Sequence, residues 1–256
     1  DQTIKTGRGQ LLAMEYFGDL AVSAYSGSGN QIQTLGSGTI SLNGLGGNNA
    51  NATTHGSGIN FFSNSGTHNI TSVNGTIELN GSSGIGSASK FVGINHDGGD
   101  VNIVSTSGAV NLTGIAGTGT TEFGFSFAGN VNIGGNGTTN STGNVTLSGD
   151  RFNSTGTYVF RNTGSVSIQP EGTSFNQGFS FDTRFSLIGT KTGLTIGKAS
   201  NSAAVTIVNA TTIAGPISLL GGNLTLTGAL TATNSDILLQ SVSPGAVTQA
   251  AAITAN

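Results

Sequence analysis

The string NHDGGD, which contains His96, Asp97 and Asp100, holds the first candidates for chemistry in this sequence. An imidazole and two carboxylates at this spacing could bind a metal ion or act as an acid–base pair. The same string is also an Asx/Gly turn that leads into a short strand at 101–103. It does not recur along the chain, as a calcium-binding nonapeptide repeat would. We therefore favour the turn and predict no metal site.

A second set of charged residues could serve an enzyme that cleaves polysaccharides. Such enzymes are often built on parallel β-helices, and they need two carboxylates about 5–9.5 Å apart or clustered Asp, Lys and Arg side chains. If coils stack, Arg151 and Arg161 are expected near Asp182 and Arg184. The full set of candidates is Asp150, Arg151, Arg161, Glu171, Asp182 and Arg184.

The alternative for this second set is that the charges lie on solvated turns, where they keep the molecule soluble and discourage sideways strand pairing. We favour this alternative, partly because the chain has no tryptophan, a common residue of sugar-binding platforms. Glycine-rich strings such as GSGTISLNG lack the βαβ context of a dinucleotide site. We therefore predict no catalytic residues and no cofactor, and we expect the chain not to be an enzyme.

The composition excludes several further classes of function. Only 7% of the 256 residues are charged, against roughly 25% in ordinary domains, and the net charge is −3. The eight Lys and Arg residues are scattered, which argues against a nucleic-acid partner. The start of the chain, DQTIKTGRGQLLAMEYF, contains no apolar stretch long enough for a signal peptide or a membrane helix, so we expect no transmembrane segment in this chain.

A short template, Gly-x-h-x-h with h aliphatic, recurs along the chain. Apolar residues that alternate with polar ones predict a strand with one buried face, and the leading glycine fits a turn that needs a positive φ. Patterned apolar residues and a low net charge argue against disorder. The template occurs at 38–42, 75–79, 99–103, 108–112, 129–133, 143–147, 164–168, 215–219 and 222–226.

The matches fall into two series that advance together every 30 to 37 residues or so. One series ends in isoleucine (Ile70, Ile103, Ile133 and Ile168) and the other in leucine (Leu42, Leu79, Leu112 and Leu147). A third apolar stretch, rich in phenylalanine, falls in the longer gap. All but one of the 13 phenylalanines lie between Phe61 and Phe185, and we expect them in the interior of the coils, with a surface binding patch as the alternative.

A repeat of about 33 residues with three short strands predicts an all-β protein, a parallel β-helix (β-solenoid) with three strands per coil. Like residues would then stack on like residues from coil to coil, about 4.8 Å apart. A sandwich or barrel, or low-complexity sequence with accidental alternation, are the alternatives. We expect one domain over 1–256, with a cap region at 1–30, this long repeat at 31–191 and shorter coils at 192–256.

The stretch GDVNIVSTSGAVNLTGIAGTGT resembles the repeat regions of large bacterial exoproteins of the filamentous-haemagglutinin type, which are exported by two-partner secretion. The C-terminal SDILLQSVSPGAVTQAAAITAN is similar to their repeats, in which a GxITQ-like element precedes an ITA strand; that element here is Gly245 to Gln249. The resemblance covers most of 30–256, but the secretion domain of that family is not recognisable.

The resemblance implies a right-handed β-helix at the bacterial cell surface or outside the cell. Its function would be adhesive or structural, and its partners would be host or neighbouring-cell surfaces, extracellular matrix or glycans. The sequence ends in mid-pattern, so we expect either a segment of something longer or a subunit that associates end to end into a filament. A β-helical polysaccharide-active enzyme remains the third hypothesis.

Overall fold

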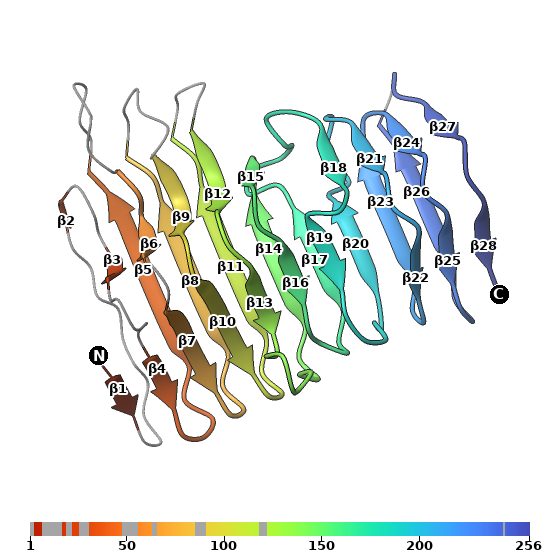
Figure 1. Ribbon diagram of the computed structural model, residues 1–256. Coiled ribbons are helices and arrows are strands. Elements are labelled where there is room, and N and C mark those ends of the chain that lie inside the picture. The colour runs from red at the N-terminus through yellow and green to blue at the C-terminus, as the bar shows by residue number, and fades with distance from the viewer. Residues whose placement is uncertain are drawn as a thin grey trace.

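The computed structural model describes residues 3–6, 17–18, 22–25, 31–47, 56–62, 66–84, 91–117, 122–242 and 244–256. These residues form strands and turns, and the strands stack side by side into one elongated tube (Figure 1). All paired strands run parallel, and each pairs with its counterpart in a neighbouring coil. The fold is a parallel β-helix with about three strands per coil, which confirms the predicted fold class and excludes the antiparallel sandwich. No helix in the described part of the chain is long and apolar enough to cross a membrane.

The first and second faces of the tube are sheets of seven and nine strands. The first contains β1 (Thr3–Thr6), β4 (Gln31–Thr34), β7 (Thr67–Ser72), β10 (Asp100–Ser105), β13 (Val131–Gly134), β16 (Tyr158–Phe160) and β19 (Phe185–Leu187). The second contains β2 (Phe17–Gly18), β5 (Ile40–Gly46), β8 (Ile77–Ser82), β11 (Val110–Ile115), β14 (Val145–Gly149), β17 (Val166–Gln169), β20 (Leu194–Gly197), β23 (Ile217–Gly221) and β26 (Ile237–Ser241).

The third face is interrupted. Its first sheet contains β3 (Val22–Tyr25), β6 (Ile59–Phe62), β9 (Val92–Asp97), β12 (Phe123–Phe127) and β15 (Phe152–Ser154), and it stops there. A new sheet begins with β18 (Phe179–Phe181) and continues through β21 (Val205–Ile207), β24 (Leu224–Leu226) and β27 (Val247–Gln249). The first face also restarts, as a three-stranded sheet of β22 (Thr211–Ile213), β25 (Leu230–Ala232) and β28 (Ile253–Ala255). Only the second face continues through both breaks.

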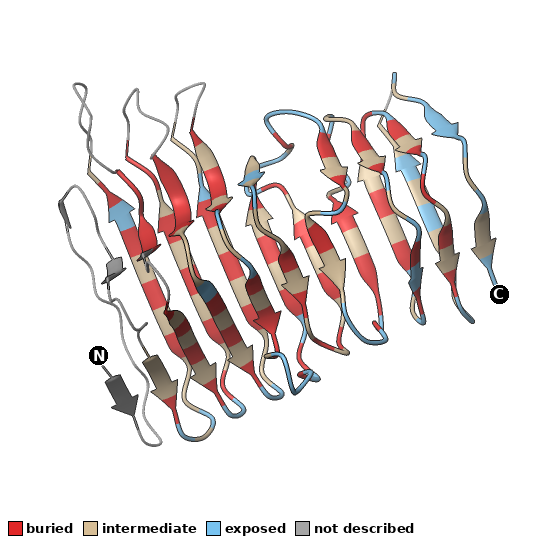
Figure 2. Ribbon diagram, in the orientation of Figure 1, coloured by how far each residue is buried: buried red, intermediate tan, exposed pale blue. Residues whose placement is uncertain are grey.

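The predicted columns of aliphatic side chains fill the interior. Leu42, Leu79, Leu112 and Leu147 are in register on successive strands of the second face, and Ile70, Ile103 and Ile133 are in register on the first. The buried and intermediate bands that alternate along these strands are visible in Figure 2. The assignment of Ile168 was wrong, because it pairs with Leu147 in the leucine column, while Phe160 follows Ile133.

The misassignment of Ile168 has a physical cause, which is that the coils become shorter along the chain. On the second face Ile77 pairs with Val110, whereas Val145 pairs with Val166, a partner much nearer in the sequence. The shortening therefore begins inside the 31–191 range for which the sequence predicts the long repeat. Within 1–30, the described strands β1, β2 and β3 pair in parallel with β4, β5 and β6, as an ordinary coil would.

The leading glycines of the template also have a different role from the one expected. Of these glycines only Gly99 has a positive φ. At the corner between the first and second faces, Gly75, Gly108 and Gly143 instead stack in a column, and a Cβ on Gly108 would lie 2.3 Å from the carbonyl oxygen of Gly75. Glycine is required there because the backbones of successive coils approach too closely for any side chain.

A column of buried polar side chains lies at the same corner, next to the glycines. Ser72 Oγ accepts a hydrogen bond from the Gly75 amide at 2.9 Å, and Ser105 Oγ donates to the Gly75 carbonyl at 2.7 Å. These hydroxyls satisfy main-chain groups that the turn leaves outside the strand ladder. The members of this polar column, all buried, are Thr34, Ser72, Ser105, Ser141, Asn162 and Lys191.

Candidate functional site

The NHDGGD string makes the tight turn between β9 and β10, which confirms the prediction of a turn that leads into a strand. Gly98 and Gly99 have φ values of 93° and 74°, which glycine adopts without strain. His96 is completely buried, and its ring packs edge-on against Phe127 with centroids 6.3 Å apart. Burial lowers the pKa of His96 and so holds the ring neutral. Within the described ranges, no group of three or more His, Cys, Asp or Glu could hold a metal ion.

The phenylalanines that the structure describes lie mainly inside the tube, as expected. Phe125, Phe127 and Phe160 are almost fully buried. The rings make contacts along the interior, for example between Phe152 and Phe179, whose centroids are 5.5 Å apart. The aromatic series therefore belongs to the interior packing of the coils and does not form a patch on the outer surface.

The second set of candidate residues is divided by the structure. Arg151 and Arg184 come together at one pocket, as the stacking of coils predicts. Arg161 does not join them, because its Nε donates a 2.8 Å hydrogen bond to Asn132 Oδ1 at the end of an asparagine ladder on the first face. Asp150 also lines the pocket, whereas Glu171 lies in the adjacent loop.

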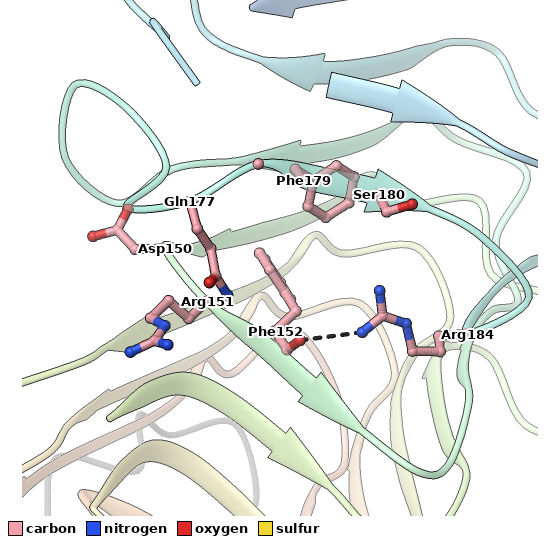
Figure 3. Close-up of a pocket in the computed structure, with 8 residues that line it drawn as sticks. Asp150, Arg151, Phe152, Gln177, Phe179, Ser180 and Arg184 are labelled. Atoms are coloured by element: carbon pink, nitrogen blue, oxygen red, sulfur yellow. Dashed lines mark hydrogen bonds between the residues drawn. The ribbon is translucent and has the colours of Figure 1, made fainter. Parts of the chain in front are cut away.

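The pocket lies at the break in the third face, between β15 and β18 (Figure 3). β15 is the last strand of one sheet and β18 is the first strand of the next, so no backbone ladder closes the space between them. The cavity has a volume of about 90 Å³. It is lined by Asp150, Arg151, Phe152, Gln177, Gly178, Phe179, Ser180 and Arg184.

One wall of the pocket is the loop of residues 170–178, which is fixed to the following coil. The buried Asn201 Oδ1 accepts hydrogen bonds from Ser174 Oγ at 3.0 Å and from the Phe175 amide at 3.2 Å. The Lys198 ammonium donates to the carbonyl oxygens of Glu171 and Gly172 at 3.1 and 3.0 Å. These bonds fix the loop against the following coil.

Arg184 bridges the gap by donating a hydrogen bond to the backbone of β15, which has no strand partner on this side. Its Nη1 donates to the Phe152 carbonyl oxygen at 3.3 Å, while its Nε and Nη2 hold both carboxylate oxygens of Asp182, at 2.9 and 2.8 Å. Burial alone would raise the pKa of Asp182, but the hydrogen bonds from Arg184 outweigh burial and lower it. Asp182 is therefore an ionised partner of Arg184 and not a proton donor.

Asp150 behaves in the opposite way. Burial raises its pKa above the usual range, and the nearby Glu171 carboxylate raises it further. Asp150 Oδ1 is buried without a hydrogen-bond partner. This oxygen has no accessible surface, so it faces the protein and not the open part of the pocket. Beside it, the guanidinium of Arg151 lies over the Phe123 ring, 5.1 Å from the centroid.

Gln177 and Ser180 are pocket residues that the sequence did not indicate. No sequence signal identifies them, because the pocket exists only where two strands of successive coils fail to pair. The sequence did not indicate the buried Lys191 either. Its Nζ donates to the carbonyl oxygens of Phe160, Asn162 and Ile188, and a lone lysine in GTKTG gives no indication of such a position.

No family model matches this chain, and no significant match was found among curated proteins or solved structures. The geometry of the tube and its pocket, together with the sequence, therefore supplies the grounds for a functional proposal.

Proposed function

We propose that this chain is a structural and adhesive segment of a large, fibre-like bacterial protein that lies at the cell surface or is secreted, and that mediates attachment. The observation that carries the proposal is the second face, where nine strands run in unbroken parallel register from β2 to β26. At about 4.8 Å per strand, this sheet gives a rod section of about 40 Å. A rod of stacked coils suits a protein that holds contacts away from a cell.

The outer surface of the rod supports attachment through short-range polar contacts. Outward side chains on the first face form a ladder in which Asn102 donates to Asn69 and Asn132 donates to Asn102, at 2.9 and 2.8 Å. With only 8 basic and 11 acidic side chains in 256 residues, long-range electrostatic attraction contributes little. The partners that fit are host or neighbouring-cell surfaces, extracellular matrix and glycans.

An extracellular location is supported by the resemblance to exoproteins of the filamentous-haemagglutinin type. It is also compatible with the interior of the tube, which contains no cysteine. A chain without cysteine is not affected by an oxidising environment. Its stability rests on stacked aliphatic and aromatic columns and on ladder hydrogen bonds, which need neither a disulfide nor a cofactor.

Attachment can be tested with beads that carry the purified chain. The beads are applied to epithelial monolayers, to collagen-coated and fibronectin-coated plates and to immobilised mucin, and retention under flow is counted. We expect retention on at least one of these surfaces above that of beads coated with the heat-unfolded chain. Equal retention of both kinds of bead on every surface would contradict the proposal.

Two alternatives predict other results. A self-assembling filament subunit would show a mass in light scattering that grows with concentration, whereas a segment would not. A polysaccharide-active enzyme is favoured by one observation, the raised pKa of Asp150 in a pocket. It would release sugars from a polysaccharide panel, and Asp150→Asn would abolish this release. Asp182→Ala, by contrast, would act through the loss of the Arg184 contact.

A further inference from the structure

We propose that the Asn136–Gly137 pair is a site of spontaneous covalent modification, at which the side-chain amide of Asn136 is lost as ammonia and an acidic residue takes its place. The pair lies in the turn between β13 and β14, in the string GNGTT. The modification is independent of the attachment function. It follows from a comparison of the four Asn–Gly pairs in the sequence, which are 43–44, 74–75, 80–81 and 136–137.

The reaction needs only these two residues and water. The main-chain nitrogen of Gly137, as it gives up its proton to the solvent, attacks Cγ of Asn136. The bond from Cγ to Nδ2 then breaks, so that ammonia leaves and a five-membered succinimide ring forms. Water opens the ring at either carbonyl and gives aspartate or isoaspartate, in which the main chain runs through the side-chain carbon. Glycine favours the attack because it has no Cβ to hinder the nitrogen.

The turn holds hydrogen-bond donors at the oxygen where negative charge develops during this attack. The main-chain amides of Thr138 and Thr139 both donate to Asn136 Oδ1 at 3.0 Å. The hydroxyls of the same two threonines donate to this oxygen at 2.8 and 3.0 Å. When Cγ is attacked, Oδ1 becomes an oxyanion, and donors that are already in place stabilise such a charge.

The pair also has room to react. Gly137 is exposed, and an added Cβ there would find no atom within 4 Å. Asn136 is partly exposed, so water can reach its side chain and ammonia can leave. Residues 135–140 lie outside the strands. Rotation of the main chain at this peptide therefore breaks no hydrogen bond of a strand ladder.

The other three pairs are held in place by the tube. Gly44 and Gly81 pair with each other in the ladder of the second face, and an added Cβ on either would lie 2.0 Å from a carbonyl oxygen. The buried Gly75 amide donates a hydrogen bond to Ser72 Oγ at 2.9 Å. The attacking nitrogen of each of these pairs is therefore fixed, either in a ladder or at the glycine corner.

The product of the reaction fits the turn. A carboxylate at position 136 accepts hydrogen bonds from the same donors more strongly than the amide does. The additional main-chain carbon of isoaspartate is accommodated because the space around Gly137 is open. The turn of residues 136–139 has no charged side chain and gains one negative charge. We therefore expect the modified chain to remain folded.

The test incubates the purified full chain at mildly alkaline pH and follows all four pairs by peptide mapping with mass spectrometry, while a methyltransferase specific for isoaspartate detects the second product. The same incubation in urea, above the unfolding transition, removes the influence of the fold. The variants are Gly137→Ala and the double variant Thr138→Val with Thr139→Val. The matched control is Thr173→Val, at an exposed threonine of another loop. Circular dichroism melting checks that every variant is folded.

We expect Asn136 in the folded chain to lose ammonia about tenfold or more faster than the other three pairs, which react only when the structure opens locally. Its rate should be no lower than in urea, whereas folding should slow the other three. The double valine variant should react about fivefold more slowly, which is the loss expected when hydroxyl donors are removed. Gly137→Ala should also slow the reaction, and Thr173→Val should leave it unchanged.

Three results would overturn the proposal. They are faster loss of ammonia at another Asn–Gly pair of the folded chain, slower reaction of Asn136 in the folded chain than in urea, and an unchanged rate in the folded double valine variant. None of them bears on attachment, which the bead assay measures separately.

Discussion

The coils before Lys191 and those after it fill their interiors with different kinds of side chain. Before Lys191, buried polar side chains follow one corner of the tube next to the glycine column, and phenylalanines fill the third face. After Asn201, the buried residues of the described chain are aliphatic apart from Thr211 and small glycines, and Leu224, Leu226 and Leu230 are typical. The coils also shorten, since on the first face Ile70 pairs with Ile103 whereas Thr211 pairs with the much nearer Leu230.

The difference shows that coil length decides which side chains fit. A long coil has corners with spare main-chain groups, which need hydroxyl or amide partners, and a wide cross-section, which needs rings. A short coil has a narrower interior, which aliphatic side chains from its three faces fill without rings. The aromatic cluster of Phe152, Tyr158, Phe175, Phe179 and Phe185 lies where the two kinds of coil meet, and there the first and third faces are interrupted.

The largest expected effect is at the glycine column of the long coils. Gly108→Ala places a Cβ 2.3 Å from the Gly75 carbonyl oxygen, and this contact can be relieved only if two backbones move apart. We expect a loss of about 3 kcal/mol or more in the free energy of unfolding, or failure to fold. The control is Gly137→Ala, at an exposed site with no atom within 4 Å of the added Cβ, where urea unfolding should show a change below about 0.5 kcal/mol. Equal stability of the two variants would mean that the coils are not packed as tightly as the column indicates.

The second effect is at Lys191, which ends the polar column. Burial lowers the pKa of Lys191 to about 8, and its ammonium group donates hydrogen bonds to three carbonyl oxygens. Lys191→Met keeps the length of the side chain but removes the donor. The Phe160 oxygen keeps its hydrogen bond from the Ile188 amide, whereas the Asn162 and Ile188 oxygens lose the ammonium, so we expect a loss of about 2–3 kcal/mol. Lys198→Met, on the outer surface, should change the free energy of unfolding by less than about 1 kcal/mol.

An unchanged free energy of unfolding for Lys191→Met would show that the boundary between long and short coils needs no polar cap. The comparison between the two regions would then rest on the aromatic cluster alone.

The third effect concerns pH and separates the regions again, because the described buried histidines, His68 and His96, are both in the long coils. The pKa of His96 is lowered in the folded state, so the unfolded chain takes up this proton first as the pH falls. Folding stability is therefore lost as the pH drops below the ordinary histidine pKa of about 6.5. His96→Phe continues the column between Phe61 and Phe127, and its melting temperature should fall less than that of wild type between pH 7.5 and pH 5.

The same steepness in both proteins would mean that His96 does not govern the acid response between pH 7.5 and pH 5. A variant of the short coils, Leu226→Val, should keep the wild-type dependence on pH, because Leu226 is buried in register with Ile207 in the aliphatic interior.

Much of this fold could be predicted from the sequence, because each coil repeats the same local pattern. Leu79 and Leu112 are separated by the spacing that puts them in register, and the pattern alone identifies them as column neighbours. Ile168 shows where such reasoning fails, since a period extrapolated from the long coils places it on the wrong face once the coil has shortened. The leading glycines were predicted to serve turns with positive φ, and their stacking in a column was not predicted, because close approach between coils is invisible in a single strand.

The pocket could be predicted only in part. Stacking of coils brings Arg151 near Arg184, as the sequence indicates, but it gives no sign that β15 and β18 fail to pair. The loop beside that gap is held by hydrogen bonds to Asn201 of the following coil. Such tertiary bonds leave no local pattern, so Gln177 and Ser180 look like ordinary turn and strand residues until the coils are assembled.

The smallest expected effect concerns the outer surface, where the long coils carry an amide ladder and the short ones carry threonines. Asn102→Ala removes two side-chain hydrogen bonds, at 2.9 Å to Asn69 and 2.8 Å from Asn132. Because both amides can then bond to water, we expect a loss of only about 1 kcal/mol in urea unfolding. Thr225→Ala, at the outward middle position of β24 on the third face of the short coils, should change stability by less than about 0.5 kcal/mol. If the asparagine ladder were cooperative along the rod, the loss at Asn102 would exceed the sum of the losses when Asn69 and Asn132 are replaced singly, and a double-mutant cycle would measure the excess directly. A loss at Thr225 as large as that at Asn102 would instead show that outward side chains stabilise both regions equally, so that the two kinds of coil differ only inside the tube.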